Sequence, residues 1–324
     1  MKRSMSHAMR QFISTAGGAA LIAIATLSPG RAQTAVRVGK AVPEAFSFVP
    51  LDVGVREGFF KKRGLDIESI AFSGDAKMQQ AAAAGGVDFL LGSGPALGFI
   101  AKGSPIKGVA AMAGAPLLLA IVARPDGPKT AADLKGKKIS VSTAGSLTYF
   151  LVSEESRRQG WGPKGIDIKP MGDMGGQIAA MKRGDTDGII TDIGNALNLQ
   201  KLGEGRILVR FTDMKDFHIH VIFATDKVIA ERPAVVKSFL EGWFESIRFM
   251  RANKEATVKI AAEVTDKSLE ITAQVYDELM PMFSDDGKFD PKALALISRS
   301  LVELDILKTE TDMSKLVNEA FLPK

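Results

Sequence analysis

Apolar and polar residues alternate along this chain with two different periods. Residues 35–42 and 65–70 place apolar side chains at every second position, which is typical of strands with one buried face. Between them, residues 49–60 place apolar side chains at the spacing of a helix. Strands and helices continue to alternate in this way, which predicts an α/β fold with largely parallel sheets.

One combination of helix, strand and polar turn occurs twice. Residues 73–86 predict a helix with Ser73 as N-cap and a glycine stop, and a strand follows at 87–93. Residues 81–97 resemble a stretch within residues 179–197 at a constant offset that matches Ala81 with Ala180, so that Ser93 and Asp192 occupy equivalent places just past a strand. Ligands of open α/β sheets bind at such strand ends. The repeat therefore predicts two lobes of similar build.

Two further apolar strands are candidates for crossovers between the lobes. They span residues 117–123 and 219–224, and each is followed by a turn or by charge and proline. With these crossovers, lobe 1 comprises residues 33–123 plus 224–324, and lobe 2 comprises residues 124–223. The segment from Arg232 onward is predicted to be helical and amphipathic.

The N-terminal 32 residues have the pattern of a secretory signal peptide. Basic residues precede an apolar run at 12–27, and Gly30 and Ala32 stand at the small-residue positions of a cleavage site. The run is short for a membrane span, which needs about 20 residues. We expect cleavage after Ala32 and a periplasmic product; an uncleaved membrane anchor is the alternative.

Composition determines the net charge of the mature chain and excludes disulfides. Four of the 42 Lys and Arg residues and none of the 37 Asp and Glu residues lie in the predicted signal, which leaves a mature charge of +1. This balance and the lack of a dense basic cluster predict no nucleic-acid partner. The chain has no cysteine, so its stability must come from the core alone and not from disulfides.

Motifs for catalysis or cofactors are missing from the sequence. There is no G-x-S-x-G pentad and no G-x-x-x-x-G-K-[ST] loop, and the glycines at 92, 94 and 98 are spaced too widely for a dinucleotide fingerprint. His218 and His220 would share one face of a strand, as half of a metal site, as ligand contacts or as a structural pair. No cysteine and no nearby third histidine completes a metal site. We therefore expect a protein that is no enzyme and that holds no metal or cofactor.

Several segments resemble one family of proteins. They are "REGFFKKRGLDIE" (56–68), "AAAAGGVDFLLGSGPAL" (81–97), "DLKGKKISVSTAGS" (133–146) and "AAMKRGDTDGIITD" (179–192). They are similar to periplasmic solute-binding proteins of ABC importers, in the branch that binds nitrate, sulfonates, taurine and thiamine precursors of the pyrimidine type. The resemblance implies a two-lobe type II periplasmic-binding-protein fold with two crossover strands and a ligand between the lobes. Pyrimidine-synthase relatives carry a cysteine-rich motif, which this chain lacks.

Polar strand-to-helix turns provide the candidate ligand contacts. Helix N-termini in such turns offer unpaired N–H groups to an anion or polar ligand, although each turn is also explained as a capped helix start. In particular, Gly145 would let a ligand approach the backbone, and Ser146 either donates to the ligand or caps its helix. The expected ligand-binding residues are Glu44, Phe46, Ser73, Gly74, Asp75, Ser93, Gly94, Thr143, Ala144, Gly145, Ser146, Met174, Asp192 and His218.

The functional prediction combines these observations with the resemblance. We expect a monomer that captures a small organic anion, such as a sulfonate or carboxylate, and delivers it to the membrane permease of an ABC importer. A pyrimidine-type heterocycle is the alternative ligand, because acids in the turns suit an amine or a ring. Two further functions stay open: a secreted hydrolase or lyase on the same scaffold, and a protein that signals ligand occupancy to a membrane receptor.

Overall fold

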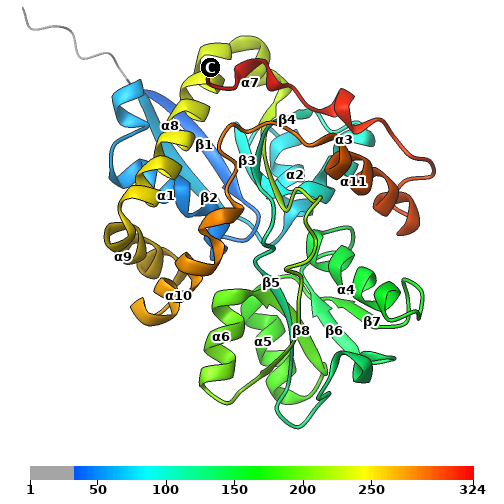
Figure 1. The fold of residues 1–324 in the computed structure, drawn as a ribbon. Coiled ribbons are helices and arrows are strands. Elements are labelled where there is room, and N and C mark those ends of the chain that lie inside the picture. Colours follow the sequence, from blue (N-terminus) through cyan, green and yellow to red (C-terminus); the bar gives the residue numbers. More distant parts are fainter. Residues whose placement is uncertain (1–32) are drawn as a thin grey trace, which may run out of the picture. The chain divides into compact units, whose positions relative to one another are not determined.

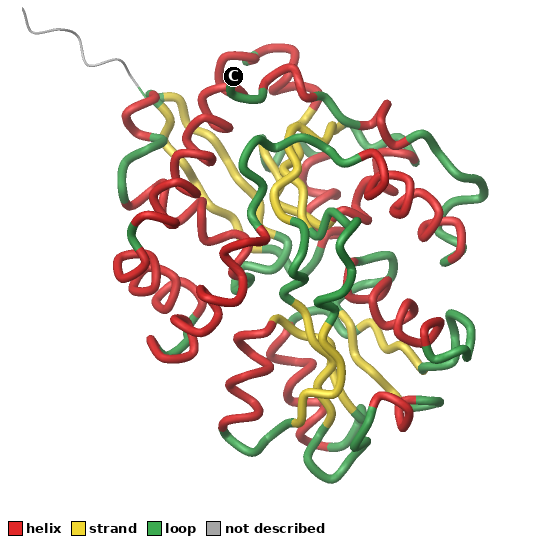
Figure 2. Tube along the Cα trace, in the orientation of Figure 1, coloured by secondary structure: helices red, strands yellow, loops and turns green. Residues whose placement is uncertain are grey.

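The structure is a computed structural model that describes residues 33–324. The predicted signal peptide lies outside the described residues. The strands of the described part form two separate five-stranded sheets, and helices pack against each sheet (Figures 1 and 2). We call each sheet with its helices a lobe.

Lobe 1 contains the sheet with the strand order β2-β1-β3-β10-β4. Its strands are β1 (Thr34–Lys40), β2 (Leu65–Ala71), β3 (Phe89–Ser93), β4 (Ile106–Ala113) and β10 (His220–Thr225). Its helices are α1 (Val49–Arg56), α2 (Asp75–Ala83), α3 (Leu97–Ala101), α7 (Asp226–Glu231), α8 (Pro233–Ala252), α9 (Lys254–Thr265), α10 (Leu269–Leu279) and α11 (Pro291–Glu303).

Lobe 2 contains the sheet with the strand order β7-β6-β8-β5-β9. Its strands are β5 (Leu119–Ala123), β6 (Lys138–Val141), β7 (Asp167–Pro170), β8 (Gly188–Asp192) and β9 (Arg206–Arg210), and its helices are α4 (Leu147–Arg158), α5 (Met174–Arg183) and α6 (Ile193–Lys201). In each sheet the fourth strand runs antiparallel to both neighbours. The shared strand order agrees with the internal repeat of the sequence, in which β3 corresponds to β8.

The two connections between the lobes precede the strands that the sequence marked as crossovers. Strand β5 pairs with β8 and β9 inside lobe 2, and β10 pairs with β3 and β4 inside lobe 1. The chain therefore passes between the sheets in residues 114–118 and 211–219. The sequence placed the lobe limits at 123/124 and 223/224, at or near the C-terminal ends of β5 and β10. Both strands are fully buried and pair inside a sheet, so the chain passes between the lobes before each strand.

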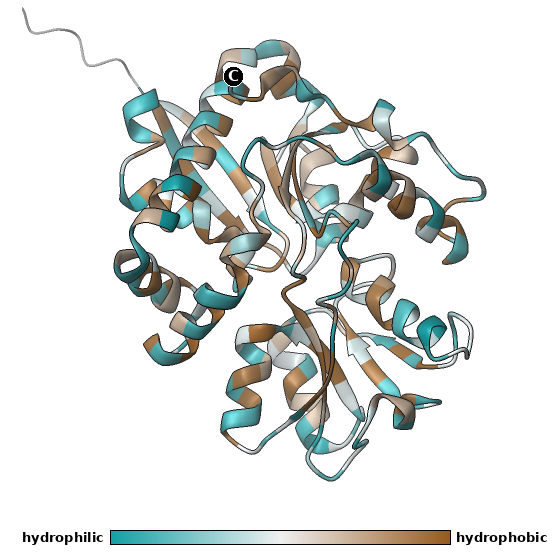
Figure 3. Ribbon diagram, in the orientation of Figure 1, coloured by the Kyte–Doolittle hydropathy of each residue, from teal (hydrophilic) through white to brown (hydrophobic). Residues whose placement is uncertain are grey.

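Burial distinguishes the central strands β3 and β8 from the edge strand β2. The central strands β3 and β8 are buried at every position, as expected for strands covered on both faces. The edge strand β2 keeps most of its residues at least partly exposed. Figure 3 shows hydrophobic residues concentrated in the central strands and along the inner faces of the helices. None of the helices within residues 33–324 is long and apolar enough to cross a membrane.

An aromatic stack joins α8 to the first sheet. Phe239 of α8 stacks on Phe89 of β3 with ring centroids 4.1 Å apart and on Phe60 at 5.3 Å. Two glycines make room for the Phe60 ring, since a Cβ at Gly54 or at Gly242 would lie 2.4 or 2.6 Å from its atoms. Alanine at either glycine would therefore force the ring or the helices apart. The stack fixes α1 and α8 against lobe 1.

Candidate functional site

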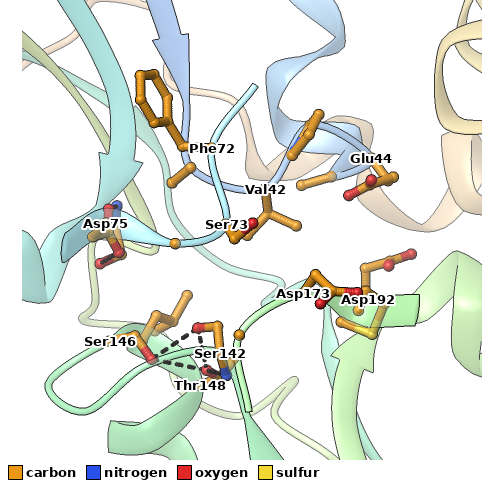
Figure 4. Close-up of a pocket in the computed structure, with 18 of the residues that line it drawn as sticks. Val42, Glu44, Phe72, Ser73, Asp75, Ser142, Ser146, Thr148, Asp173 and Asp192 are labelled. Atoms are coloured by element: carbon orange, nitrogen blue, oxygen red, sulfur yellow. Dashed lines mark hydrogen bonds between the residues drawn. The ribbon is translucent and has the colours of Figure 1, made fainter. Parts of the chain in front are cut away.

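A cavity of about 180 Å³ lies between the two lobes. Its lining comes from the carboxyl ends of β1, β2 and β3 in lobe 1 and of β6, β7 and β8 in lobe 2. The first residues of the antiparallel strands β5 and β10 reach the same edges. Figure 4 shows Glu44 and Ser73 at the cavity from lobe 1, and Ser142 and Asp173 from lobe 2. Ligands of α/β sheets bind at such strand ends, so this cavity is the candidate site.

Asp75 is held rigidly at the first position of α2. Its carboxylate accepts hydrogen bonds from the Ser93 backbone N–H at 3.0 Å and from the Ser93 hydroxyl at 2.8 Å. Gly92 makes this possible, because a Cβ there would lie 2.7 Å from Asp75 Oδ1. Burial raises the pKa of Asp75, and the hydrogen bonds from Ser93 oppose this shift.

Asp192 is the corresponding acid of lobe 2, at the end of β8. It caps α6 by accepting hydrogen bonds from the Asn195 backbone N–H at 3.0 Å and from the Asn195 side-chain amide at 2.5 Å. Burial raises its pKa; the Asn195 N–H and the charge of Lys267 lower it, and the charge of Glu44 adds to the increase. Asp192 also lines a small adjoining recess that includes Phe46 and Lys267.

In the hydroxyl-rich turn after β6, the hydroxyls of Ser142, Ser146 and Thr148 bond to one another, whereas the buried Thr143 hydroxyl has no partner. Ser146 caps α4, accepting from the Tyr149 N–H at 3.3 Å, and its hydroxyl donates to the Thr143 carbonyl at 2.7 Å. The hydroxyls of Ser142 and Thr148 lie within 3.1 Å of the Ser146 hydroxyl (Figure 4). The capping role that the sequence left open for Ser146 is therefore present, although the residue also lines the cavity.

Two lining side chains have a buried polar atom without a partner. Gln177 in the first turn of α5 has an unpaired Oε1, and His220 at the start of β10 has an unpaired Nδ1. Burial lowers the pKa of His220 to about 3, so its ring is neutral at ordinary pH. The ring packs edge-on against Phe48 with centroids 4.8 Å apart.

The charged groups of the lining are all of one sign. Four carboxyl groups line the cavity, those of Glu44, Asp75, Asp173 and Asp192, and no Lys or Arg of residues 33–324 does so. Lys267 lies behind Asp192 in the adjoining recess. Within the same residues, no group of three or more His, Cys, Asp or Glu side chains has a metal-binding arrangement. The cavity is therefore suited to a ligand that donates hydrogen bonds or carries positive charge.

Eight of the expected ligand-binding residues line the cavity. They are Glu44, Ser73, Gly74, Asp75, Ser93, Ser146, Met174 and Asp192. The sequence predicted Ser73 as the N-cap of α2. In the structure the N-cap is Gly74, with φ of +99°. A Cβ at Gly74 would lie 3.1 Å from Thr143 of lobe 2, so the glycine lets the two lobes approach closely here.

Six expected residues lie outside the lining: Phe46, Gly94, Thr143, Ala144, Gly145 and His218. A Cβ at Gly145 would point to Ile306 at 3.3 Å, and one at Gly94 would lie 2.0 Å from the His218 carbonyl oxygen. The His218 ring accepts a hydrogen bond from the Asp290 N–H at 2.8 Å. Gly94, Gly145 and His218 make these close contacts, and Phe46 lines the adjoining recess. A ligand contact at any of the six residues stays a prediction.

Further lining residues were not expected from the sequence. They include Val42, Phe72, Ser142, Thr148 and Gln177. Asp173, an acid of a candidate polar turn, and His220, left open as a ligand contact, also line the cavity. Ser142 belongs to a turn that follows a strand, so the strand-end rule would have found it if it had been applied to every residue of each turn. Gln177 lies one helical turn into α5, and no pattern in the sequence marks it as a residue of the site.

Comparisons with known proteins identify the family and the fold of this chain. Residues 45–257, more than half of the chain, match the NMT1/THI5-like family. A Haemophilus influenzae protein named for thiamine biosynthesis is 35% identical over 94 residues. That match covers 29% of this chain and 30% of the relative's own length.

Solved structures match over most of the described part. The alkanesulfonate-binding protein SsuA of Xanthomonas axonopodis pv. citri, bound to MOPS, has a TM-score of 0.77 at 16% identity and covers 89% of this chain and 99% of its own. The periplasmic nitrate-binding protein NrtA of Synechocystis has a TM-score of 0.70 at 16% identity, with 89% and 87% covered. At these identities the likeness shows the fold. The chain therefore belongs to the NMT1/THI5-like family and has the two-lobe fold of periplasmic binding proteins.

Proposed function

We propose that this protein is a periplasmic solute-binding protein that captures a small molecule between its lobes for an ABC importer. Its fold, its family and a cavity lined by strand ends of both lobes support this function. The protein acts as a monomer in this proposal and releases its ligand, chemically unchanged, to a membrane permease.

The charge of the cavity lining is the observation that selects the ligand class. The sequence favoured an organic anion, with a pyrimidine-type heterocycle as the alternative. Four carboxyl groups and no Lys or Arg among the described residues line the cavity, and an anion placed there would face repulsion from both lobes. We therefore propose an amino-substituted nitrogen heterocycle, whose N–H groups donate to these carboxylates.

Calorimetry and thermal unfolding with two small probes test this proposal. We expect 4-aminopyrimidine to bind and to stabilise the protein, by about 2.7 kcal/mol at a hundredfold excess over its Kd. Propanesulfonate should neither bind nor stabilise. Binding of propanesulfonate without 4-aminopyrimidine would overturn the ligand class, and chemical conversion of the bound probe, seen by mass spectrometry, would overturn the transport function.

A further inference from the structure

The inference concerns how the proposed ligand is recognised, and it rests on the proposed function. Gln177 is 1% exposed and His220 is 6% exposed, and each carries a buried polar atom without a partner in the described part. Buried polar groups in native proteins are nearly always paired, so each exception requires an explanation. Both side chains line the same cavity, one from each lobe.

The side-chain amide of Gln177 has a fixed orientation. Its Nε2 donates to the Gly172 carbonyl oxygen at 2.9 Å. Since a carbonyl oxygen only accepts, the amide nitrogen must face Gly172, and Oε1 is left as an acceptor without a partner. A ligand group that satisfies Oε1 must therefore be an N–H or O–H donor.

The polar neighbour of His220 is already engaged elsewhere. His220 pairs in register with Ser93 on β3, but both the N–H and the hydroxyl of Ser93 donate to Asp75. Phe48 covers the ring from another side with an apolar edge. A neutral imidazole has one donor and one acceptor nitrogen, so the ring offers the cavity a hydrogen-bonding group of either kind.

We propose that Gln177 and His220 determine ligand specificity, with Gln177 accepting from a ligand N–H and His220 pairing with a second polar atom. Because the two residues belong to different lobes, one ligand satisfies both only when the lobes enclose it. A ligand that lacks the N–H leaves Gln177 unpaired and is rejected. The ligand class is an uncharged or cationic nitrogen compound with adjacent donor and acceptor atoms, and an oxyanion is excluded.

A matched pair of probes tests the role of Gln177. Pyrimidine has the ring of 4-aminopyrimidine without its N–H donor, and we expect it to bind about tenfold more weakly to the natural protein. Gln177→Met should reduce the preference for 4-aminopyrimidine over pyrimidine, because it removes one acceptor of the ligand N–H groups. Thr186→Val is the control, since Thr186 is another buried residue with an unpaired hydroxyl in lobe 2 but lies outside the lining. It should keep the preference of the natural protein.

His220→Phe provides a readout that needs no ligand. Phenylalanine keeps the apolar contact with Phe48 and removes the unpaired nitrogen, so the ligand-free variant should unfold at the same or a higher urea concentration than the natural protein. It should also bind 4-aminopyrimidine several-fold more weakly. Trp243→Phe, which removes an unpaired nitrogen of lobe 1 outside the lining, should leave binding unchanged.

The outcomes separate this inference from the proposed function. Equal affinity of the natural protein for both probes, or an unchanged preference in Gln177→Met, overturns the role of Gln177 while leaving transport intact. A lower urea midpoint for His220→Phe overturns the claim that its ring lacks a partner in the folded protein. If the natural protein binds propanesulfonate and neither heterocycle, both the ligand class and this inference fail.

Discussion

His220 makes the stability of the ligand-free protein dependent on pH. Burial lowers its pKa to about 3, whereas a histidine of the unfolded chain titrates near 6.5. Below that value the unfolded state binds a proton that the folded state does not, so stability is lost as the pH falls. We expect His220 to contribute a loss of about 2 kcal/mol in unfolding free energy between pH 7 and pH 5. Urea unfolding at the two pH values measures it.

His220→Phe is the control for this effect, because it lacks the titrating ring. The raised pKa values of Asp75 and Asp192 act in the opposite direction, since the folded state then holds protons that the unfolded state releases. These two acids are present in both proteins, so their contribution cancels in the comparison. An equal loss of stability in His220→Phe would show that the histidine is not responsible.

At the scale of elements, the start of α4 shows what Ser146 does. We expect Ser146→Ala to lower the unfolding free energy by about 1 kcal/mol, because the Tyr149 N–H loses its cap. We also expect less than about a twofold change in affinity for 4-aminopyrimidine, since the Ser146 hydroxyl is already bonded within its own turn. Urea unfolding and calorimetry measure the two effects separately.

Ser268 provides the matched control on lobe 1. It caps α10 by accepting from the Ile271 N–H at 3.3 Å, the same distance as in the α4 cap, and it lies outside the cavity lining. Ser268→Ala should lower stability by a similar amount and leave binding unchanged. If Ser146→Ala weakens binding several-fold while Ser268→Ala does not, the Ser146 hydroxyl contacts the ligand.

The elements themselves were largely predictable from the sequence, because apolar periodicity is a local property. The strand from Leu65 to Ala71 and the helix from Asp75 to Ala83 follow the expected pattern closely. The sheet to which β5 or β10 belongs was not predictable, since a fully apolar strand has the same pattern in either sheet. The N-cap of α2 was misassigned because Gly74 adopts a positive φ that no side-chain pattern signals.

The candidate site was only partly predictable for a similar reason. Ser93 and Asp192 end their strands, and Asp75 starts the helix after β2, so the strand-end rule selected all three. Gln177 and His220 reach the cavity through the orientation of a helix and of an antiparallel strand. That orientation depends on pairing between distant segments, which a single sequence does not encode in any local pattern.

At the scale of the whole molecule, ion pairs between the lobes share one polarity. In every such pair of the described residues the cation is on lobe 2 and the acid on lobe 1. The pairs are Lys201–Glu270 at 2.5 Å, Arg157–Glu303 at 2.7 Å, Arg210–Glu278 at 3.1 Å and Lys164–Asp305 at 3.7 Å. Their acids lie on α10 and at the end of α11, so two separate contacts favour approach of the lobes.

We expect reversal of one of these charges to favour the open form. Lys201→Glu faces Glu270 with a like charge, which should enlarge the radius of gyration of the ligand-free protein and weaken 4-aminopyrimidine binding by about threefold. Lys201→Glu combined with Glu270→Lys restores an attractive pair and should recover both values. X-ray scattering and calorimetry in low salt measure them.

Lys259→Glu is the control for this reversal, because its pair with Glu255 lies inside α9. It changes the net charge by the same amount without affecting a contact between the lobes. If Lys201→Glu combined with Glu270→Lys keeps the radius of gyration and the affinity of Lys201→Glu alone, the Lys201–Glu270 pair does not hold the lobes together.

The position of β10 has a consequence for the order in which the protein folds. β10 fills the place between β3 and β4, although residues 114–219 separate it from them, whereas the strands of lobe 2 all lie within residues 119–210. Lobe 2 can therefore close its sheet through shorter loops. Until residue 225 has been synthesised, β3 and β4 keep open edges that could pair with another chain. During refolding, pulsed hydrogen exchange should find β5 and β8 protected before β3 and β4; the reverse order would mean that lobe 1 folds without its inserted strand.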